Sequence, residues 1–194
     1  MPGGSLAVPR GQEVVPVANR LICLKGKWFD KIIATQDWHP KQHRSFASQH
    51  GGYKPGDVIQ VAGLEQVLWP DHCVQGSSGA KFFSKLNIES ADFVVQKGTD
   101  MEVDSYSGFF DNGRRKVTLL LEYLRNNRIS DLYLLGLATD YCVKFTALDA
   151  VSLGFRTFLV EDGCRGVNLK SYDSEVSVKD MKNAGVHIMC SQEL

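Results

Sequence analysis

Short apolar runs alternate along the chain with segments whose apolar residues recur every three or four positions. The short runs predict buried β-strands at Lys31–Thr35, Phe93–Gln96, Leu132–Leu135 and Phe155–Val160, with a final strand at Val186–Met189. The helical spacing covers Val14–Leu24, Arg115–Asn126, Tyr141–Leu153 and Asp173–Ala184. Strands that alternate with helices are typical of a parallel sheet with crossover helices. We therefore expect one α/β domain over residues 1–194, a three-layer parallel sheet with helices on both faces.

The beginning of the chain departs from this alternation. A Gly-rich turn at residues 3–4 leads to the first helical segment, with no apolar run in front of it. A domain of this class is expected to open on a strand. The pattern therefore predicts that a first strand precedes Met1 and is missing from this sequence.

The segment from Asp37 to about Leu86 has little regular pattern and is rich in His, Gly, Pro, Gln and Trp. A long irregular stretch within a compact domain is usually a functional loop region. Four of the five histidines fall in it, namely His39, His43, His50 and His72.

Composition excludes several classes of function. The chain has 22 basic and 22 acidic residues, so no global field attracts nucleic acid or a membrane surface. The short basic run at residues 114–116 is interpreted as the solvated start of a helix. Five scattered cysteines without a CxxC pair indicate neither a disulfide framework nor a structural zinc site. With no signal peptide or membrane span in the pattern, we expect a cytoplasmic protein.

Cys142 is the first candidate for chemistry. It follows a predicted strand and lies in the first turn of a predicted helix, within Gly136–Cys142. A helix N-terminus favours a thiolate and can hold the oxyanion that forms when a thiolate attacks a carbonyl. The alternative is a small buried apolar residue.

A second candidate is a metal site. Asp37 and His39 follow the predicted strand Lys31–Thr35, at the end of the strand where open parallel sheets bind ligands. Together with His72, and with His43 nearby, they offer ligands that suit zinc, iron or manganese. The alternative is a set of surface histidines in a polar loop.

Lys97 and three aromatic residues complete the candidates. Lys97 ends the strand Phe93–Gln96, so its ammonium could stabilise a thiolate or an oxyanion, or simply extend to water. Trp38, Trp69 and Tyr106 could enclose a flat ring, although each could equally fill the core.

The order of these motifs resembles a known family. They are Pro2-Gly3-Gly4-Ser5-Leu6, Gln36-Asp37-Trp38-His39-Pro40, Trp69-Pro70-Asp71-His72-Cys73, Asp104-Ser105-Tyr106-Ser107-Gly108, Leu137-Ala138-Thr139-Asp140-Tyr141-Cys142 and Asp162-Gly163-Cys164-Arg165-Gly166. In this order they resemble the nicotinamidase and pyrazinamidase branch of the isochorismatase-like cysteine hydrolases. The resemblance implies hydrolysis of nicotinamide, and of pyrazinamide, to the acid and ammonia through a cysteine thioester, in NAD salvage.

The resemblance also implies a role for each site residue. Cys142 matches the nucleophile and Lys97 the lysine of the triad. The backbone N–H groups of Ala138 and Cys142 match the oxyanion hole, with a cis peptide bond before Ala138. The other matching positions are the ligands of one divalent transition metal ion (zinc, or iron or manganese) at Asp37, His39 and His72, an additional or outer ligand at His43, and the ring-packing aromatics Trp69 and Tyr106.

One departure from the family pattern limits these expectations. The family's third triad member, an aspartate that moves the proton between thiol and ammonia, lies on a strand in front of the motif that begins at Pro2. The sequence therefore predicts reduced turnover. It leaves two alternatives open, a truncated paralogue that binds metal or nicotinamide and a related small-amide hydrolase. It also leaves open whether the chain forms a homo-oligomer.

Overall fold

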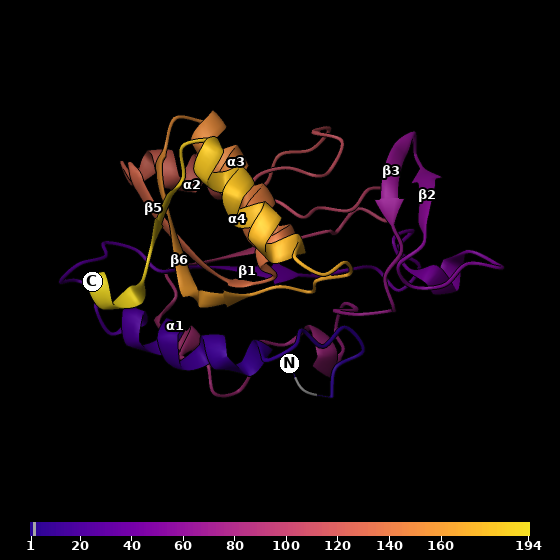
Figure 1. Ribbon diagram of the computed structural model, residues 1–194, viewed down its shortest axis with the longest axis horizontal. Coiled ribbons are helices and arrows are strands. Elements are labelled where there is room, and N and C mark those ends of the chain that lie inside the picture. The colour runs from indigo at the N-terminus through magenta and orange to yellow at the C-terminus, as the bar shows by residue number, and fades with distance from the viewer. Residues whose placement is uncertain (2) are drawn as a thin grey trace.

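Parallel strands form the centre of the computed structural model, which describes residues 1 and 3–194 (Figure 1). One group pairs β1 (Ile33–Asp37) with β4 (Phe93–Lys97), and a second group has the order β5 (Asp131–Leu137), β6 (Arg156–Arg165) and β7 (His187–Met189). All pairs in both groups are parallel. Pro2 of the first motif lies outside the described residues.

Four α-helices cover the two faces of the sheet. Helix α1 (Val14–Ile22) lies below the strands in Figure 1, whereas α2 (Leu120–Asn126), α3 (Lys144–Ser152) and α4 (Asp173–Asn183) lie above them. Short 3₁₀ helices occur at Gly11–Glu13, Ala47–Gln49, Ser78–Ala80, Ile88–Ser90 and Ser191–Glu193. This arrangement confirms the predicted three-layer α/β fold.

The core on the upper face consists of two clusters, one for each group of strands. Leu120 and Leu124 of α2 pack with Val95 of β4 and with Phe109. Met181 of α4 packs with Leu159 of β6, together with Ala147 of α3 and Val143. The apolar positions that predicted the helices are therefore the ones that anchor them to the sheet.

The irregular segment contains a β-hairpin that the sequence pattern did not reveal. Strands β2 (Val58–Val61) and β3 (Leu64–Val67) pair antiparallel across a two-residue turn. Both turn residues, Ala62 and Gly63, have positive φ angles of 51° and 78°. Such angles are typical of tight hairpin turns, but alanine at the first position is an unusual signal for one.

Helix α2 begins five residues later than predicted, at Leu120 rather than Arg115. The reason is Asp111, whose carboxylate accepts hydrogen bonds from the backbone N–H groups of Gly113, Arg115 and Lys116. These bonds hold the segment in a turn and compete with helical hydrogen bonding. The basic run is consequently a loop and not the start of a helix, and its Arg114 side chain pairs with Asp149.

Strands β1 and β5 do not pair with each other within the described part of the chain. A cavity of about 1270 Å³ separates them and is lined by every residue of both strands. Every residue of β5 is partly exposed, and Thr35 of β1 is exposed, so the prediction that these two strands are buried is wrong. One edge of each strand is open. The prediction of a first strand before Met1 stays a prediction.

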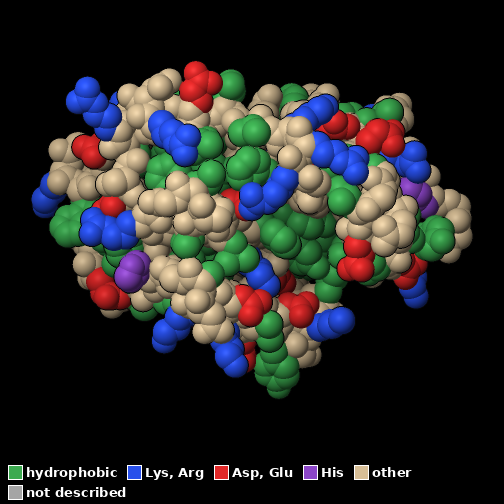
Figure 2. Space-filling model, turned by 90° about the horizontal axis from the view of Figure 1, so that it is seen from above, with side chains coloured by type: hydrophobic (Ala, Val, Ile, Leu, Met, Phe, Trp, Pro, Cys, Tyr) green, Lys and Arg blue, Asp and Glu red, His purple; other side chains and the backbone are tan. Residues whose placement is uncertain are grey.

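Charges and cysteines agree with the composition. Acidic and basic side chains are interspersed over the face shown in Figure 2, with apolar side chains between them. All five cysteines are free thiols.

Within residues 1 and 3–194, none of the helices combines the length and the apolar character needed to cross a bilayer.

Candidate active site

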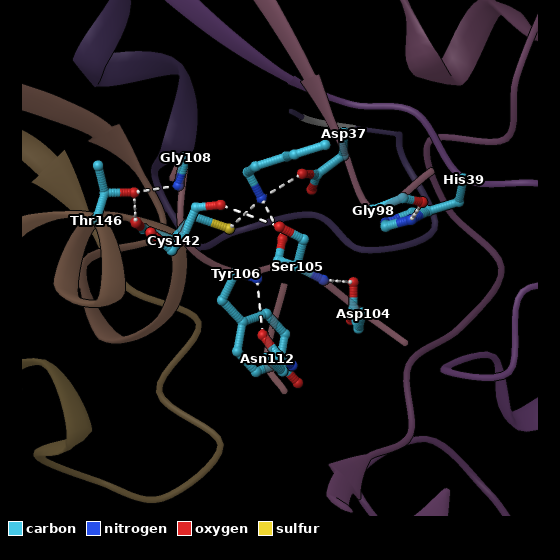
Figure 3. Close-up of polar contacts among 12 residues, drawn as sticks. Asp37, His39, Gly98, Asp104, Ser105, Tyr106, Gly108, Asn112, Cys142 and Thr146 are labelled. Carbon is cyan, nitrogen blue, oxygen red and sulfur yellow. Dashed lines mark hydrogen bonds and ion pairs between the residues drawn. The ribbon is translucent and has the colours of Figure 1, made fainter. Parts of the chain in front are cut away.

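Lys97 lies at the centre of the site and joins three segments of the chain. The register of the sheet places it opposite Asp37, at the carboxyl ends of β4 and β1. Its ammonium lies 2.6 Å from Asp37 Oδ1 and 3.2 Å from Cys142 Sγ, and donates a hydrogen bond of 2.8 Å to the carbonyl of Ser105. Figure 3 shows these contacts as dashed lines that converge between Asp37, Ser105 and Cys142.

The charges of Lys97 and Asp37 stabilise each other. Burial disfavours the charged form of Lys97, but the Asp37 carboxylate and the Cys142 sulfur outweigh it and raise the pKa of Lys97 above its usual range. Burial also opposes ionisation of Asp37, yet Lys97 and then His39 lower its pKa to about 2. Lys97 is therefore a permanent cation at neutral pH, suited to holding negative charge and not to accepting a proton.

Cys142 lies in a π-helical turn, Thr139–Val143, that precedes α3. The predicted position in the first turn of an α-helix is therefore corrected, although the segment does connect β5 to a helix. Such π-helical turns occur frequently at functional sites. The peptide bond between Leu137 and Ala138 is cis, as expected.

The thiol of Cys142 is less acidic than the sequence predicted. Burial raises its pKa to about 11, although Lys97 acts in the opposite direction. Desolvation thus opposes the thiolate form that a helix N-terminus favours. That Cys142 is an activated nucleophile stays a prediction. Deprotonation must accompany the chemical step.

Asp140 fixes the turn that carries Cys142 and was not singled out from the sequence. Its buried carboxylate accepts hydrogen bonds from the backbone N–H groups of Val167, at 2.9 Å, and Asn168, at 2.7 Å. These bonds tie the loop after β6 to the Cys142 turn. In the sequence, its position two residues before Cys142 was the only feature that could have indicated this role.

The predicted metal ligands come together at the other side of Asp37. One potential ligand atom from each of Asp37, His39 and His72 lies within 4.8 Å of the other two. His39 Nδ1 donates to the carbonyl of Gly98, and His72 Nδ1 donates to that of Pro70, both at 2.8 Å. A carbonyl can only accept, so each ring keeps its Nε2 lone pair free. Histidine ligands of metals are oriented in this way, so the residues fit a metal ion.

His43 extends this cluster. It lies with His39 and Asp104 in a second set of potential ligands, all three of them buried. His43 Nδ1 is 2.7 Å from Ser45 Oγ, and its buried Nε2 has no hydrogen-bond partner among the described residues. Burial lowers the pKa of His43 to about 4, so the ring is neutral at neutral pH. His50, by contrast, is partly exposed and bonds to the carbonyl of Arg44.

Aromatic rings form one wall of the crevice. The rings of Trp69 and Tyr106 pack edge to face at 6.5 Å, and Tyr141 contacts both, at 4.8 Å and 5.3 Å. The Trp69 indole N–H donates to the Tyr106 hydroxyl. Tyr141 was missed from the sequence, although it directly precedes Cys142. Trp38 does not line this cavity, in contrast to the expectation.

Comparison with known proteins identifies the family. A family model described as the isochorismatase domain matches residues 2–193. The chain belongs to the isochorismatase family. It is 52% identical to a nicotinamidase of Escherichia coli (strain K12), over 94% of this chain and 85% of that protein. The predicted resemblance is thus confirmed.

Two solved structures extend the similarity to three dimensions. A nicotinamidase/pyrazinamidase from Acinetobacter baumanii is 40% identical, with a TM-score of 0.94 over 100% of this chain and 91% of that chain. A pyrazinamidase of Pyrococcus horikoshii in complex with zinc is 38% identical, with a TM-score of 0.78 over 98% and 92%.

Proposed function

We propose that this isochorismatase-family chain is a cytoplasmic amidohydrolase that converts nicotinamide, and also pyrazinamide, to the acid and ammonia in NAD salvage. The observation that carries this proposal is the contact between Cys142 Sγ and the buried Lys97 ammonium, 3.2 Å apart, beside a cluster of potential metal ligands. The similarity to proteins named nicotinamidase supports the choice of substrate.

The reaction follows from the positions of these groups. Cys142 Sγ attacks the amide carbon, and the oxyanion that forms is held by the backbone N–H groups of Ala138 and Cys142. The C–N bond breaks and ammonia leaves with the proton of the thiol, which gives a thioester. Water then adds to the thioester carbon and the C–S bond breaks. One proton of the water returns to the sulfur, the other is taken up by ammonia or solvent, and the carboxylate product is released. Lys97 stabilises the negative charge that develops on sulfur when the thiol loses its proton and again when the C–S bond breaks.

Proton transfer between the thiol and the leaving ammonia requires a group that can accept and return a proton. Lys97 stays charged, so it does not serve as this base. Among the described residues, the carboxylate in contact with Lys97 is that of Asp37, which is also assigned to the metal. The site as described therefore offers strong charge stabilisation and a weaker acid–base system.

Asp37, His39 and His72 would hold one divalent transition metal ion, with His43 as an additional or outer ligand. When bound, the ion would supply a Lewis acid for the ring nitrogen of the substrate. Zinc is favoured by the similarity to a pyrazinamidase solved with zinc, and the same ligands suit iron and manganese. The aromatic rings of Trp69, Tyr106 and Tyr141 would pack against the pyridine ring.

Ammonia release from nicotinamide and pyrazinamide tests the proposal. We expect activity that Cys142→Ala abolishes and Cys190→Ala, an exposed cysteine, leaves intact. Mass spectrometry of trapped enzyme should show an acyl group on Cys142. Hydrolysis of other small amides with no action on nicotinamide would instead identify a related hydrolase, and binding of nicotinamide without any turnover would identify a binding protein. Either result contradicts the proposal.

A further inference from the structure

Thr146 connects the turn that carries Cys142 to a second segment of the active site. It lies in α3 and is buried. Its hydroxyl donates a hydrogen bond of 2.6 Å to the Cys142 carbonyl and accepts one of 2.9 Å from the Gly108 N–H. Figure 3 shows both bonds meeting at the Thr146 hydroxyl. This hydroxyl thus uses its hydrogen and a lone pair to join two backbone groups.

The bond from Gly108 is the unusual one of the two. Threonine in a helix often donates to the carbonyl four residues before it, so the bond to Cys142 alone would be ordinary. Gly108, however, is 38 residues away from Thr146 in the chain. A Cβ atom on Gly108 would lie 3.2 Å from side-chain carbons of Thr35 and Leu120, so glycine at this position allows the close approach.

Gly108 belongs to a segment that also holds Lys97, and we call residues 105–110 the 105–110 segment. The Ser105 carbonyl accepts a hydrogen bond from the Lys97 ammonium at 2.8 Å. The Ser105 hydroxyl donates to a carbonyl within the same segment, and Thr118 Oγ1 donates to the Gly108 carbonyl at 2.6 Å. These bonds fix Ser105 and Gly108 relative to each other.

Cys142 is therefore attached to the 105–110 segment through two routes. Its sulfur lies 3.2 Å from the Lys97 ammonium, which the segment holds. Its carbonyl is held by Gly108 through the Thr146 hydroxyl, in a chain of hydrogen bonds that strengthen one another. Because a single torsion separates the backbone of a cysteine from Sγ, the second route limits where the sulfur can lie.

We propose that Thr146 is a positioning residue for the reaction of Cys142, and that its hydroxyl sets the distance between Cys142 Sγ and the Lys97 ammonium. It acts through the Cys142 backbone and takes no part in bond formation itself. Misplacement of a reacting group by about 1 Å can lower a rate by about 10²-fold. The effect on turnover rests on the proposed function, whereas the effect on the reactivity of the thiol does not.

The test compares Thr146→Val, which keeps the shape of the side chain and removes the hydroxyl, with Thr146→Ser, which keeps the hydroxyl. Thr146→Val should lower kcat for nicotinamide about 10- to 100-fold and change KM less than about threefold. Thr146→Ser should restore most of kcat. Thr157→Val is the matched control and should leave kcat unchanged. Thr157 is also buried, its hydroxyl donates to the Phe155 carbonyl, and it does not line the cavity between β1 and β5.

A second measurement needs no substrate. The alkylation rate of Cys142 at about pH 8 is mapped by mass spectrometry, with the exposed Cys190 as internal reference. Loss of the Thr146 hydroxyl should move Sγ away from Lys97 and so remove stabilisation of the thiolate. Thr146→Val should therefore slow alkylation about threefold or more. A merely structural role predicts the opposite sign, because a loosened turn exposes the thiol and speeds its alkylation.

Three outcomes would overturn the proposal: an unchanged kcat in Thr146→Val, failure of Thr146→Ser to restore kcat, and unchanged or faster alkylation of Cys142 in Thr146→Val. Circular dichroism checks that the variants fold. Should Thr146→Val not fold, Thr146→Ala takes its place in the comparison with Thr146→Ser. Absence of nicotinamide hydrolysis in the unmodified chain would instead contradict the proposed function, and the alkylation rates would still decide the role of Thr146.

Discussion

The two sides of the candidate active site satisfy their polar atoms in opposite ways. On the side of Cys142, the Lys97 ammonium contacts a carboxylate, a carbonyl and a sulfur within the protein. On the histidine side, His39 and His72 each fix Nδ1 on a backbone carbonyl, and the buried Nε2 of His43 has no partner among the described residues. Buried polar atoms are normally paired. On the Cys142 side, the polar atoms are thus paired within the protein and stabilise charge. On the histidine side, unpaired nitrogens remain for a ligand.

Asp37 belongs to both sides, since it contacts Lys97 and lies with the histidines. Because the two sides share only Asp37, we expect changes on each side to have different effects. Changes on the side of Cys142 should lower turnover and keep the metal, and changes on the histidine side should lower metal content first.

Lys97→Met should have the largest effect. Removing the cation leaves the developing charge on sulfur and oxygen without its buried counter-ion, so kcat should fall by about 10²- to 10³-fold. Metal content, measured by elemental analysis, should be retained, and circular dichroism checks that the variant folds despite the unpaired Asp37. Loss of metal together with activity would show that the two sides are not separable.

The second prediction concerns the metal. The folded protein should contain close to one equivalent of a divalent transition metal ion, and His72→Ala should weaken its retention by at least about 10-fold. His50→Ala is the matched control, because His50 lies in the same irregular segment but is partly exposed and bonds to the carbonyl of Arg44. A folded protein that contains no metal, or equal loss in both variants, would contradict the assignment.

The third prediction uses the pKa of Cys142, which burial raises to about 11. The thiolate fraction must then increase about tenfold per pH unit from neutral pH to about pH 10, and the alkylation rate should follow it. Mass-spectrometric mapping after timed alkylation measures the rate at this residue. Cys73 and Cys164, whose pKa values burial raises to about 12, should label more slowly. A rate that levels off near pH 7 would indicate a thiolate stabilised as the sequence first suggested.

The smallest effect is expected for Asp140→Asn. The amide keeps one acceptor for the two N–H groups of Val167 and Asn168 and brings a donor against the other, which should cost about 1 to 3 kcal/mol of stability. Because Asp140 touches neither Lys97 nor the histidines, metal content should be unchanged and kcat should fall less than tenfold. Denaturant unfolding and steady-state assays measure both. A larger loss of kcat at unchanged stability would give Asp140 a direct role in the chemistry.

The sequence by itself determined the layered fold and most of the site. Strand and helix periodicities are local properties, so β4, β5 and α4 lie close to their predicted bounds. Parallel strands also bring their carboxyl ends to one edge of a sheet, and this rule was enough to place Asp37 and Lys97 in the same site.

Only the tertiary structure decided how these residues behave. The late start of α2 depends on the Asp111 side chain, and the attachment of the Cys142 turn depends on Asp140, through bonds to a loop 27 and 28 residues away. The raised pKa of the Cys142 thiol comes from the burial that surrounding segments impose, which no local motif encodes. The open edges of β1 and β5 likewise exist only once the strands are placed in space. Periodicity reports what a segment prefers, whereas desolvation, pairing and hydrogen-bond competition depend on partners distant in sequence.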